Sequence, residues 1–229
     1  MWSTQISGLD LLKAGRWTVA FFNQGELRST AGYPMRPISD VAAERRGAAD
    51  PQQMGDTTIN YLGLENVRSQ TGELVEFSPR PAMSIKSRSK IFKGGDVLFG
   101  RLRPELNKVY LADGVVAEGL CSGEFIVLTA DEKSVLPRFL RHVLASQYVT
   151  QFAARLKVGA SLPRMGTEDL MGIAIPVPPI AAQKRLVKRL EVLDKEIEET
   201  RQKLTTLPTA TARALMDCLD RGADDLETA

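Results

Sequence analysis

The fold of this chain is decided by residues 159–204, which run GASLPRMGTEDLMGIAIPVPPIAAQKRLVKRLEVLDKEIEETRQKL. A small polar loop opens the stretch, and a short apolar run then ends in the prolines Pro176, Pro178 and Pro179. Because proline fixes φ and cannot donate a backbone hydrogen bond, we expect an extended connector here, and neither helix nor central strand. A long charged helix follows at once, so the stretch predicts a joint between a globular body and a helix.

The helix after the prolines carries a narrow apolar stripe. Its members recur at steps of four and three residues, and they are Leu186, Leu190, Leu193, Ile197 and Leu204. Gln183 and Thr200 take polar positions of the same stripe. A strict heptad stripe is typical of a coiled coil, and it predicts pairing with a partner helix through these residues. The alternative is an amphipathic helix packed on its own domain, which usually has a wider apolar face.

A second informative segment is Lys93-Gly94-Gly95-Asp96-Val97-Leu98-Phe99-Gly100. The two glycines allow a tight turn, and we expect Asp96 to bond nearby backbone amides, as aspartate does in turns. The apolar residues that follow predict a strand. Further short strand patterns on both sides, separated by turns, predict a curled, mostly antiparallel sheet.

Helical patterns flank these strands. Residues 136–146 predict a helix with Pro137 in its first turn, where proline is tolerated, and residues 148–156 predict a second. Residues 38–44 resemble a short helix capped by Ser39. Leu207-Pro208 predicts a break in the long helix, after which a short helix and an acidic tail are expected.

Three motifs together resemble the specificity subunit of type I restriction–modification enzymes. They are Gly-x-Ser-x-Pro-x-Met at residues 159–165, Leu-x-x-Ile-x-Ile-Pro-x-Pro-Pro at residues 170–179, and the glutamine that opens the heptad helix. The segment at residues 95–101 is also close to a Gly-Asp-Val-Leu-like element of that family. The resemblance covers roughly residues 37–204, and Ala182 stands where the family usually has glutamate.

The resemblance implies an α+β fold and a half-length form of the specificity subunit, with one recognition domain. One target-recognition domain, with a curled, mostly antiparallel sheet and flanking helices, is followed by one long coiled-coil helix. We expect the recognition domain at residues 1–179, the coiled-coil helix at residues 180–206, and a short helix with an acidic tail at residues 207–229.

The composition is ordinary for a globular protein, with 43% hydrophobic and 25% charged residues. The two cysteines, Cys121 and Cys218, match no metal or redox spacing, so we expect reduced thiols in a cytoplasmic protein. We expect neither a signal peptide nor a membrane span, because no suitable apolar stretch is present. With one histidine and no clustered cysteines, the sequence predicts no metal and no cofactor.

Positive charge is concentrated in the middle of the chain, although the net charge is only +2. Residues 84–108 contain seven basic residues against two acidic ones, whereas residues 217–229 contain five acidic residues against one basic one. A local basic field attracts phosphate even when the total charge is nearly balanced. The middle of the chain therefore predicts a nucleic-acid partner.

Catalytic alternatives find no support in the motifs. The sequence has no GxGxxG loop and no Walker A loop, and Val177-Pro178-Pro179-Ile180 lacks the polar and aromatic residues of a DNA methyltransferase motif. Glu124-Phe125-Ile126 lacks the lysine that a nuclease motif needs two positions after its glutamate. We therefore expect a binding protein with no catalytic residues.

Eleven polar residues are the candidate contacts to DNA. A first group suits backbone phosphates, a second follows the predicted strand and suits a groove, and a third lies in the loop after the second helix. In this order they are Lys86, Arg88, Lys90 and Lys93; Arg101, Arg103, Asn107 and Lys108; and Lys157, Ser161 and Arg164. Arginine can pair with guanine and asparagine with adenine. The alternative for each residue is a solvated surface side chain.

The resemblance implies double-stranded DNA and separate modification (methyltransferase) and restriction subunits as partners. One recognition domain with one helix can rebuild a full-length subunit only by pairing, so we expect a homodimer that recognises two inverted half-sites. Two alternatives remain: a fragment of a fused restriction–modification enzyme, and a coiled-coil adaptor that binds only protein. Salt-sensitive DNA binding separates the first interpretation from the adaptor, because phosphate contacts release counterions.

Overall fold

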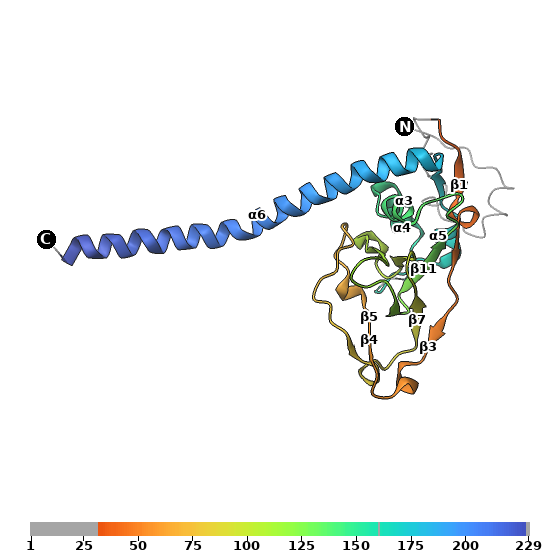
Figure 1. Cartoon of the computed structure of the whole chain (residues 1–229), viewed down its shortest axis with the longest axis horizontal. Coiled ribbons are helices and arrows are strands. Elements are labelled where there is room, and N and C mark those ends of the chain that lie inside the picture. The colour runs from red at the N-terminus through yellow and green to blue at the C-terminus, as the bar shows by residue number, and fades with distance from the viewer. Residues whose placement is uncertain (1–31, 160, 228–229) are drawn as a thin grey trace. The chain divides into compact units, whose positions relative to one another are not determined.

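A computed structural model describes residues 32–159 and 161–227 of the chain. The chain divides into two units: the first ends at Leu186, and the second is the rest of helix α6 (Ile180–Glu227). The first unit also contains α3 (Pro137–Leu144), α4 (Gln147–Leu156) and α5 (Thr167–Met171), with α3 and α4 beside one another (Figure 1). Residues 1–31 of the predicted recognition domain lie outside the described residues.

The described strands form four small sheets. The two larger sheets have the orders β3-β7-β10-β5 and β2-β11-β8-β9, and the smaller ones pair β1 with β12 and β4 with β6. The strands are β1 (Met35–Pro37), β2 (Ala42–Glu44), β3 (Ala48–Ala49), β4 (Thr58–Ile59), β5 (Tyr61–Leu62), β6 (Arg80–Pro81), β7 (Ser89–Phe92), β8 (Val97–Gly100), β9 (Val109–Leu111), β10 (Gly119–Cys121), β11 (Phe125–Ala130) and β12 (Ala174–Pro176). Among the described strands, only the β5–β10 pair is parallel. The prediction of an α+β fold with mostly antiparallel strands is confirmed, with the strands divided among several sheets.

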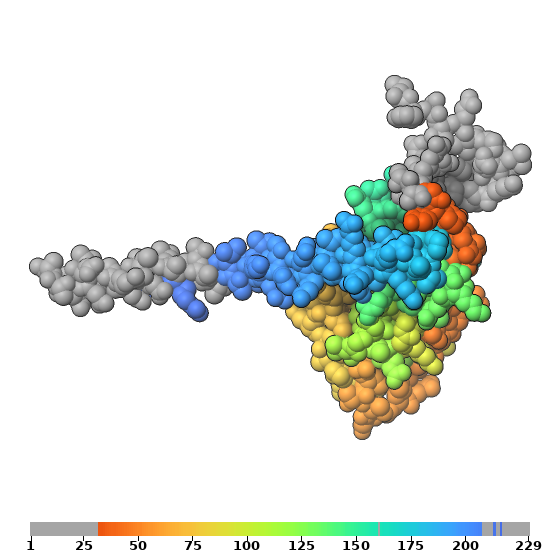
Figure 2. Space-filling view, turned by 45° about the horizontal axis from the view of Figure 1, so that its top comes forward, coloured from red at the N-terminus to blue at the C-terminus, as the bar shows by residue number. Residues whose placement is uncertain are grey.

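Short 3-10 helices join many of these strands. They are η1 (Ile38–Asp40), η2 (Pro51–Met54), η3 (Leu64–Asn66), η4 (Ala82–Ser84) and η5 (Pro104–Leu106). In η2, Asp50 caps the first turn by accepting a hydrogen bond from the backbone N–H of Gln52. The orange segment around β3, η2 and β4 forms one end of the first unit (Figure 2).

The main core lies between the two four-stranded sheets. Leu62, Phe92 and Cys121 come from one sheet, and they pack in the same cluster as Leu98, Tyr110, Phe125 and Val127 from the other. Strand β8 is buried along its whole length, as are the first four residues of β11. Runs of this kind, without polar alternation, are typical of strands covered on both faces. Because β8 and β11 lie at the centre of their sheet, the residues directly after β8 and directly before β11 are held in fixed positions.

The turn before β8 is held by Asp96. One carboxylate oxygen, Oδ2, accepts from the backbone N–H of Lys93 at 2.8 Å and from Nε of Arg45 at 2.6 Å. The other, Oδ1, accepts from the hydroxyl of Thr129 at 2.8 Å. The expectation that Asp96 bonds a nearby backbone amide is confirmed, and Gly95 supplies the positive φ of 84° that the turn requires.

The helix expected at residues 38–44 is wrong. The chain forms only η1 there and then enters β2, whose residues pair with Leu128, Thr129 and Ala130 of β11. The side chain of Ser39 makes no cap, because the residue that precedes η1 is Pro37. Pairing with the edge of a buried sheet outweighs the weak helical pattern of this segment. The helices expected around Pro137 and residues 148–156 are confirmed as α3 and α4.

The proline connector has the form that the sequence predicts. Strand β12 ends at Pro176 and, among the described strands, pairs with β1 alone, at an edge position where proline is tolerated. Helix α6 begins at Ile180, directly after Pro179, and runs to Glu227. The predicted break at Leu207-Pro208 is therefore wrong, because α6 continues through both residues. One proline removes a single backbone donor, and the turns on either side continue the helix.

Candidate functional site

A surface hollow of about 440 Å³ gathers three of the candidate arginines. It is lined by Ser87, Arg88, Arg101, Ser122, Gly123, Glu124 and Arg164. These residues come from four segments: the approach to β7, the exit of β8, the turn before β11, and the loop after α4. Residues predicted separately as phosphate contacts, groove contacts and loop contacts thus share one site.

Backbone hydrogen bonds bring these segments together. The N–H of Arg101 donates to the carbonyl of Glu124 at 2.8 Å, and the N–H of Met165 donates to the carbonyl of Arg101 at 3.0 Å. The N–H of Arg103 donates to the carbonyl of Pro163 at 2.9 Å, and Leu102 forms a β-bridge with Arg164. The exit of β8 is therefore fixed against the loop that carries Arg164.

Arg164 is held by a carboxylate across the hollow. Its Nε lies 3.0 Å from both Oε1 and Oε2 of Glu124, and its Nη2 donates to Oε1 at 2.6 Å. Nη1 donates to the carbonyl of Leu162 at 3.1 Å. The hydrogen bonds to Glu124, together with its charge, raise the pKa of Arg164. Such a two-point pair fixes the orientation of the guanidinium as well as neutralising it.

The other two guanidinium groups of the hollow are not neutralised. In the part of the chain that the structure describes, neither Arg88 nor Arg101 has a carboxylate partner. Arg88 is exposed, whereas Arg101 is half-buried and its Nε is buried without an acceptor among the described residues. The hollow therefore carries three positive groups against one negative group, and two of them have donors to offer a ligand.

Six further candidates lie outside the hollow on the surface of the fold, and they differ in exposure and pairing. Lys90 pairs with Glu44 at 3.1 Å, and Lys157 pairs with Glu105 at 3.0 Å, so both are partly neutralised. A further four are exposed, namely Lys86, Lys93, Arg103 and Ser161. Arg103 has a positive φ of 47°, which places it at a sharp turn just after β8.

Asn107 and Lys108 serve the interior of the fold. Asn107 is buried, and its Nδ2 donates to the carbonyl of Ala145 at 2.6 Å. Nζ of Lys108 donates to the carbonyl of Leu64 at 2.7 Å. The sequence placed both in a surface loop, but η5 turns this segment inward. A buried amide engaged in this way is not available to an adenine edge, so the expected base contact of Asn107 has no support here.

Glu124 is the charged residue of the hollow that was not among the eleven candidate contacts to DNA. It stands 40 positions from Arg164, and only the folded chain brings the two together. Its neighbour Ser122 shapes the turn, because the N–H of Glu124 donates to Oγ of Ser122 at 3.2 Å. No local pattern distinguishes this glutamate from a solvated one, so the signal was absent from the sequence.

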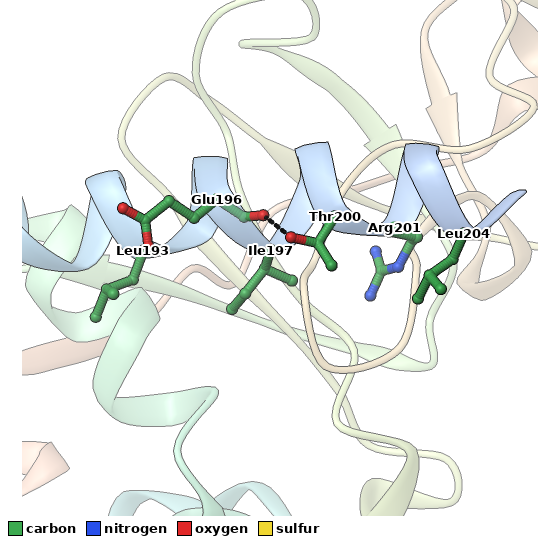
Figure 3. A pocket seen from close by; sticks show the side chains of 6 residues that line it. All are labelled: Leu193, Glu196, Ile197, Thr200, Arg201 and Leu204. Atoms are coloured by element: carbon green, nitrogen blue, oxygen red, sulfur yellow. Dashed lines mark hydrogen bonds between the residues drawn. The ribbon is translucent and has the colours of Figure 1, made fainter. Parts of the chain in front are cut away.

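The second unit presents the predicted apolar stripe. Leu193, Ile197 and Leu204 are 45%, 51% and 62% exposed, and their side chains point to the same side of α6 (Figure 3). With Glu196, Thr200 and Arg201 they line a shallow depression of about 560 Å³. Leu186 is 40% exposed, and Leu190 is half-buried. The stripe is an apolar surface of the kind that a partner helix covers.

Gln183 does not share this surface, contrary to the expectation from its heptad position. It is buried in the first unit, where its side chain bonds backbone groups of Ser134, Leu136 and Pro178. The exposed stripe therefore begins at Leu186, in the second turn of α6.

The described residues hold neither a candidate metal site nor a candidate membrane span. Within residues 32–159 and 161–227, no group of three or more histidine, cysteine, aspartate or glutamate side chains could hold a metal ion. None of the described helices has the length and apolar character needed to cross a membrane. Cys121 is buried in the core, while the side chain of Cys218 lies outside the described part.

Comparisons with known proteins agree on one family. Residues 35–208 match the family model described as the type I restriction modification DNA specificity domain. The chain is similar to the type I restriction enzyme EcoDI specificity subunit of Escherichia coli, with 24% identity over 68% of this chain and 33% of that protein. It is also similar to the StySPI specificity subunit of Salmonella potsdam, with 23% identity over 81% of this chain and 41% of that protein.

Solved structures give the same result. The HsdS subunit from Thermoanaerobacter tengcongensis superposes with a TM-score of 0.68 and 26% identity, over 78% of this chain and 46% of that one. The type I restriction–modification system S subunit from M. genitalium, at 18% identity and a TM-score of 0.52, shares the fold. The chain spans less than half the length of each of these proteins.

Proposed function

This chain belongs to the family of type I restriction modification DNA specificity domains, and we propose that it is a sequence-specific DNA-binding specificity subunit. In this role it directs separate modification (methyltransferase) and restriction subunits to their target in the cytoplasm. It contributes recognition and assembly but no catalytic step of its own.

The observation that carries this proposal is the basic hollow. Two guanidinium groups without carboxylate partners stand beside a third that is fixed in orientation. Phosphates and base edges are acceptors that arginine binds in two-point fashion. The exposed Lys86, Lys93 and Arg103 add positive charge that suits the DNA backbone, where contacts position a protein and carry most of the salt dependence.

Assembly is the second part of the proposal. A half-length subunit needs a second recognition domain, and a twofold homodimer through the stripe of α6 supplies it. Residues 180–206 as helix span roughly 40 Å at ~1.5 Å per residue. That length is close to one turn of DNA, ~34–36 Å, so two antiparallel helices suit two domains on one face of a duplex. The site recognised is then two inverted half-sites with an unread spacer.

The experiment that tests the function is DNA selection by the purified chain. Selection from a random duplex pool, followed by binding measurements between low and moderate salt, should yield one preferred sequence made of two inverted halves. Affinity for it should fall steeply with salt, because several phosphate contacts release counterions. A chain that binds no duplex at low salt, yet still self-associates, would be the protein-only adaptor instead.

A further inference from the structure

The hollow that contains Arg101 mixes donors with an acceptor. Arg88 and Arg101 offer N–H groups, whereas Glu124 offers carboxylate oxygens, and its side chain is 28% exposed. We propose that Arg101 and Glu124 make this hollow a reader of a G·C base pair, rather than a clamp for a backbone phosphate. The inference rests on the proposed function, and it assigns to Glu124 a role in selectivity.

The carboxylate is what argues against a phosphate. A phosphate presents only acceptors, so it can bind the arginines of this hollow but offers no donor to the carboxylate oxygens of Glu124, which it would face at close range. Arg164 lies nearest to that carboxylate, and its Nε and Nη2 donors already bond to Glu124. A base edge is neutral, so it avoids the repulsion that a like charge imposes at this range.

The composition of the hollow fits a G·C pair seen from the major groove. Guanine presents the acceptors N7 and O6, which arginine binds in two-point fashion, and cytosine presents an amino donor that glutamate accepts. Arg101 and Glu124 are adjacent in the fold, because the N–H of Arg101 donates to the carbonyl of Glu124 at 2.8 Å. One residue of each kind therefore stands at neighbouring backbone positions.

Arg101 is also prepared for such a contact. Backbone hydrogen bonds hold it on both sides, to Glu124 and to Met165, and its side chain is half-buried. No described residue accepts from its buried Nε. A guanidinium that is positioned but unpaired loses little conformational freedom on binding, which is the general advantage of a preorganised site.

Glu124 acts as a positioning and selectivity residue in this scheme. It orients Arg164, and its charge offsets one of the three positive groups, which lowers the attraction of the hollow for phosphates of any sequence. Glu124→Gln keeps the size of the side chain but removes the charge. We therefore expect this variant to bind unrelated DNA more tightly than the wild type and to discriminate less between target and unrelated duplexes.

The test compares site selection by the full-length wild type, Arg101→Ala, Glu124→Gln and a control, Arg138→Ala. Arg138 pairs with Asp113 and lies outside the hollow, so the control removes the same charge elsewhere. We expect Arg101→Ala to lose one G·C position from the selected sequence, with roughly 5- to 150-fold weaker binding to the wild-type site. A 7-deazaguanine at that position, which lacks N7, should weaken wild-type binding but leave Arg101→Ala unchanged.

The phosphate alternative gives the opposite pattern. In that case Arg101→Ala weakens binding equally for all sequences. The difference in affinity between the wild type and Arg101→Ala then disappears on DNA with neutral methylphosphonates and persists on DNA with 7-deazaguanine. This result would mean that Arg101 holds a phosphate and that the inference is wrong. The inference is also wrong if Arg101→Ala selects the same sequence with the same affinity as the wild type. The proposed function would survive that result, because it depends only on DNA binding by the wild type. If the wild type itself binds no duplex, the proposed function fails first. Thermal melting of each variant checks that it is folded.

Discussion

Oε1 of Gln183 accepts a hydrogen bond from the backbone N–H of Leu136 at 2.9 Å. The same amide donates through Nε2 to the carbonyls of Ser134 and Pro178, at 2.9 and 2.8 Å. One buried side chain thus joins the first turn of α6 to the entry of α3 and to the proline connector. The residue that opens the heptad pattern in the sequence fixes the start of the helix in the structure.

Gln183→Ala should destabilise the first unit. The substitution leaves one backbone donor and two carbonyls buried without their partner, and each unmade bond of this kind costs about 1–3 kcal/mol. Urea unfolding should show a lower midpoint for this variant. Gln202→Ala is the matched control, because Gln202 is exposed and bonds only Glu198, and its midpoint should hardly move. Equal midpoints for the two variants would contradict the structural role of Gln183.

Asp96→Asn should also destabilise the first unit. Asp96 is fully buried, and its carboxylate bonds Arg45, Thr129 and the N–H of Lys93. Removing the charge leaves Arg45 without its partner, at a cost of roughly 3 kcal/mol in denaturant unfolding. Asp40→Asn is the control, since the only ion pair of Asp40 among the described residues is an exposed one with Arg36, and its loss should cost under ~1 kcal/mol. If Asp96→Asn unfolds together with the wild type, the turn before β8 does not depend on this carboxylate.

Cys121 should not react with thiol reagents in the folded protein. Burial raises the pKa of its thiol from the ordinary value of 9.0 to about 12, and the thiolate is the reactive form. In a Cys218→Ser background, a thiol reagent at pH 8 should label no cysteine until urea is added. The raised pKa favours the folded state below pH 9, and this contribution is lost as the pH rises toward 12. Rapid labelling of the folded variant would show that the core opens readily.

Substitution of the stripe should separate the proposed dimer. Leu190→Asp with Ile197→Asp places two carboxylates on the surface that we propose to be covered by a second α6. Sedimentation at micromolar concentration should change from dimer to monomer, while the circular dichroism of the first unit is retained. Lys195→Asp is the control, because Lys195 is 79% exposed and lies outside the stripe. A wild type that sediments as a monomer, with variants that behave alike, would remove the dimer from the proposal.

Arg101→Ala combined with Arg103→Ala should weaken DNA binding substantially. The loss is expected to be ~1–3 kcal/mol for each residue that contacts a base, measured by fluorescence anisotropy at moderate salt. Arg103 is exposed and outside the hollow, so its share should shrink as salt is raised, as phosphate contacts do. Unchanged affinity of the double variant would exclude the exit of β8 from the interface.

Local patterns in the sequence predicted the elements that local chemistry determines. Gly95 and Asp96 predicted the turn before β8, and the prolines predicted an extended connector with a long helix directly after it. These features depend on φ preferences and on hydrogen bonds within a few residues. They are therefore readable in a single sequence.

The features that sequence reasoning missed depend on distant partners. Residues 42–44 became a strand because β11 offered an edge, and Gln183 became buried because Ser134 and Leu136 surround it. The candidate site was predicted only as scattered basic residues. The contact that organises the site joins Glu124 and Arg164, which are 40 positions apart, so it produces no periodic pattern in the sequence.

The hollow also bears on how such a chain can change its target during evolution. Its walls come from segments that run from Ser87 to Arg164, tied by the Glu124–Arg164 pair and by backbone bonds from Arg101 to both sides. A recombination junction inside this interval, such as one between α3 and α4, would inherit Glu124 from one parent and residue 164 from the other. It would leave a carboxylate without its arginine unless both parents carried the pair. New specificities should therefore spread between chains as whole blocks, with junctions outside residues 87–164.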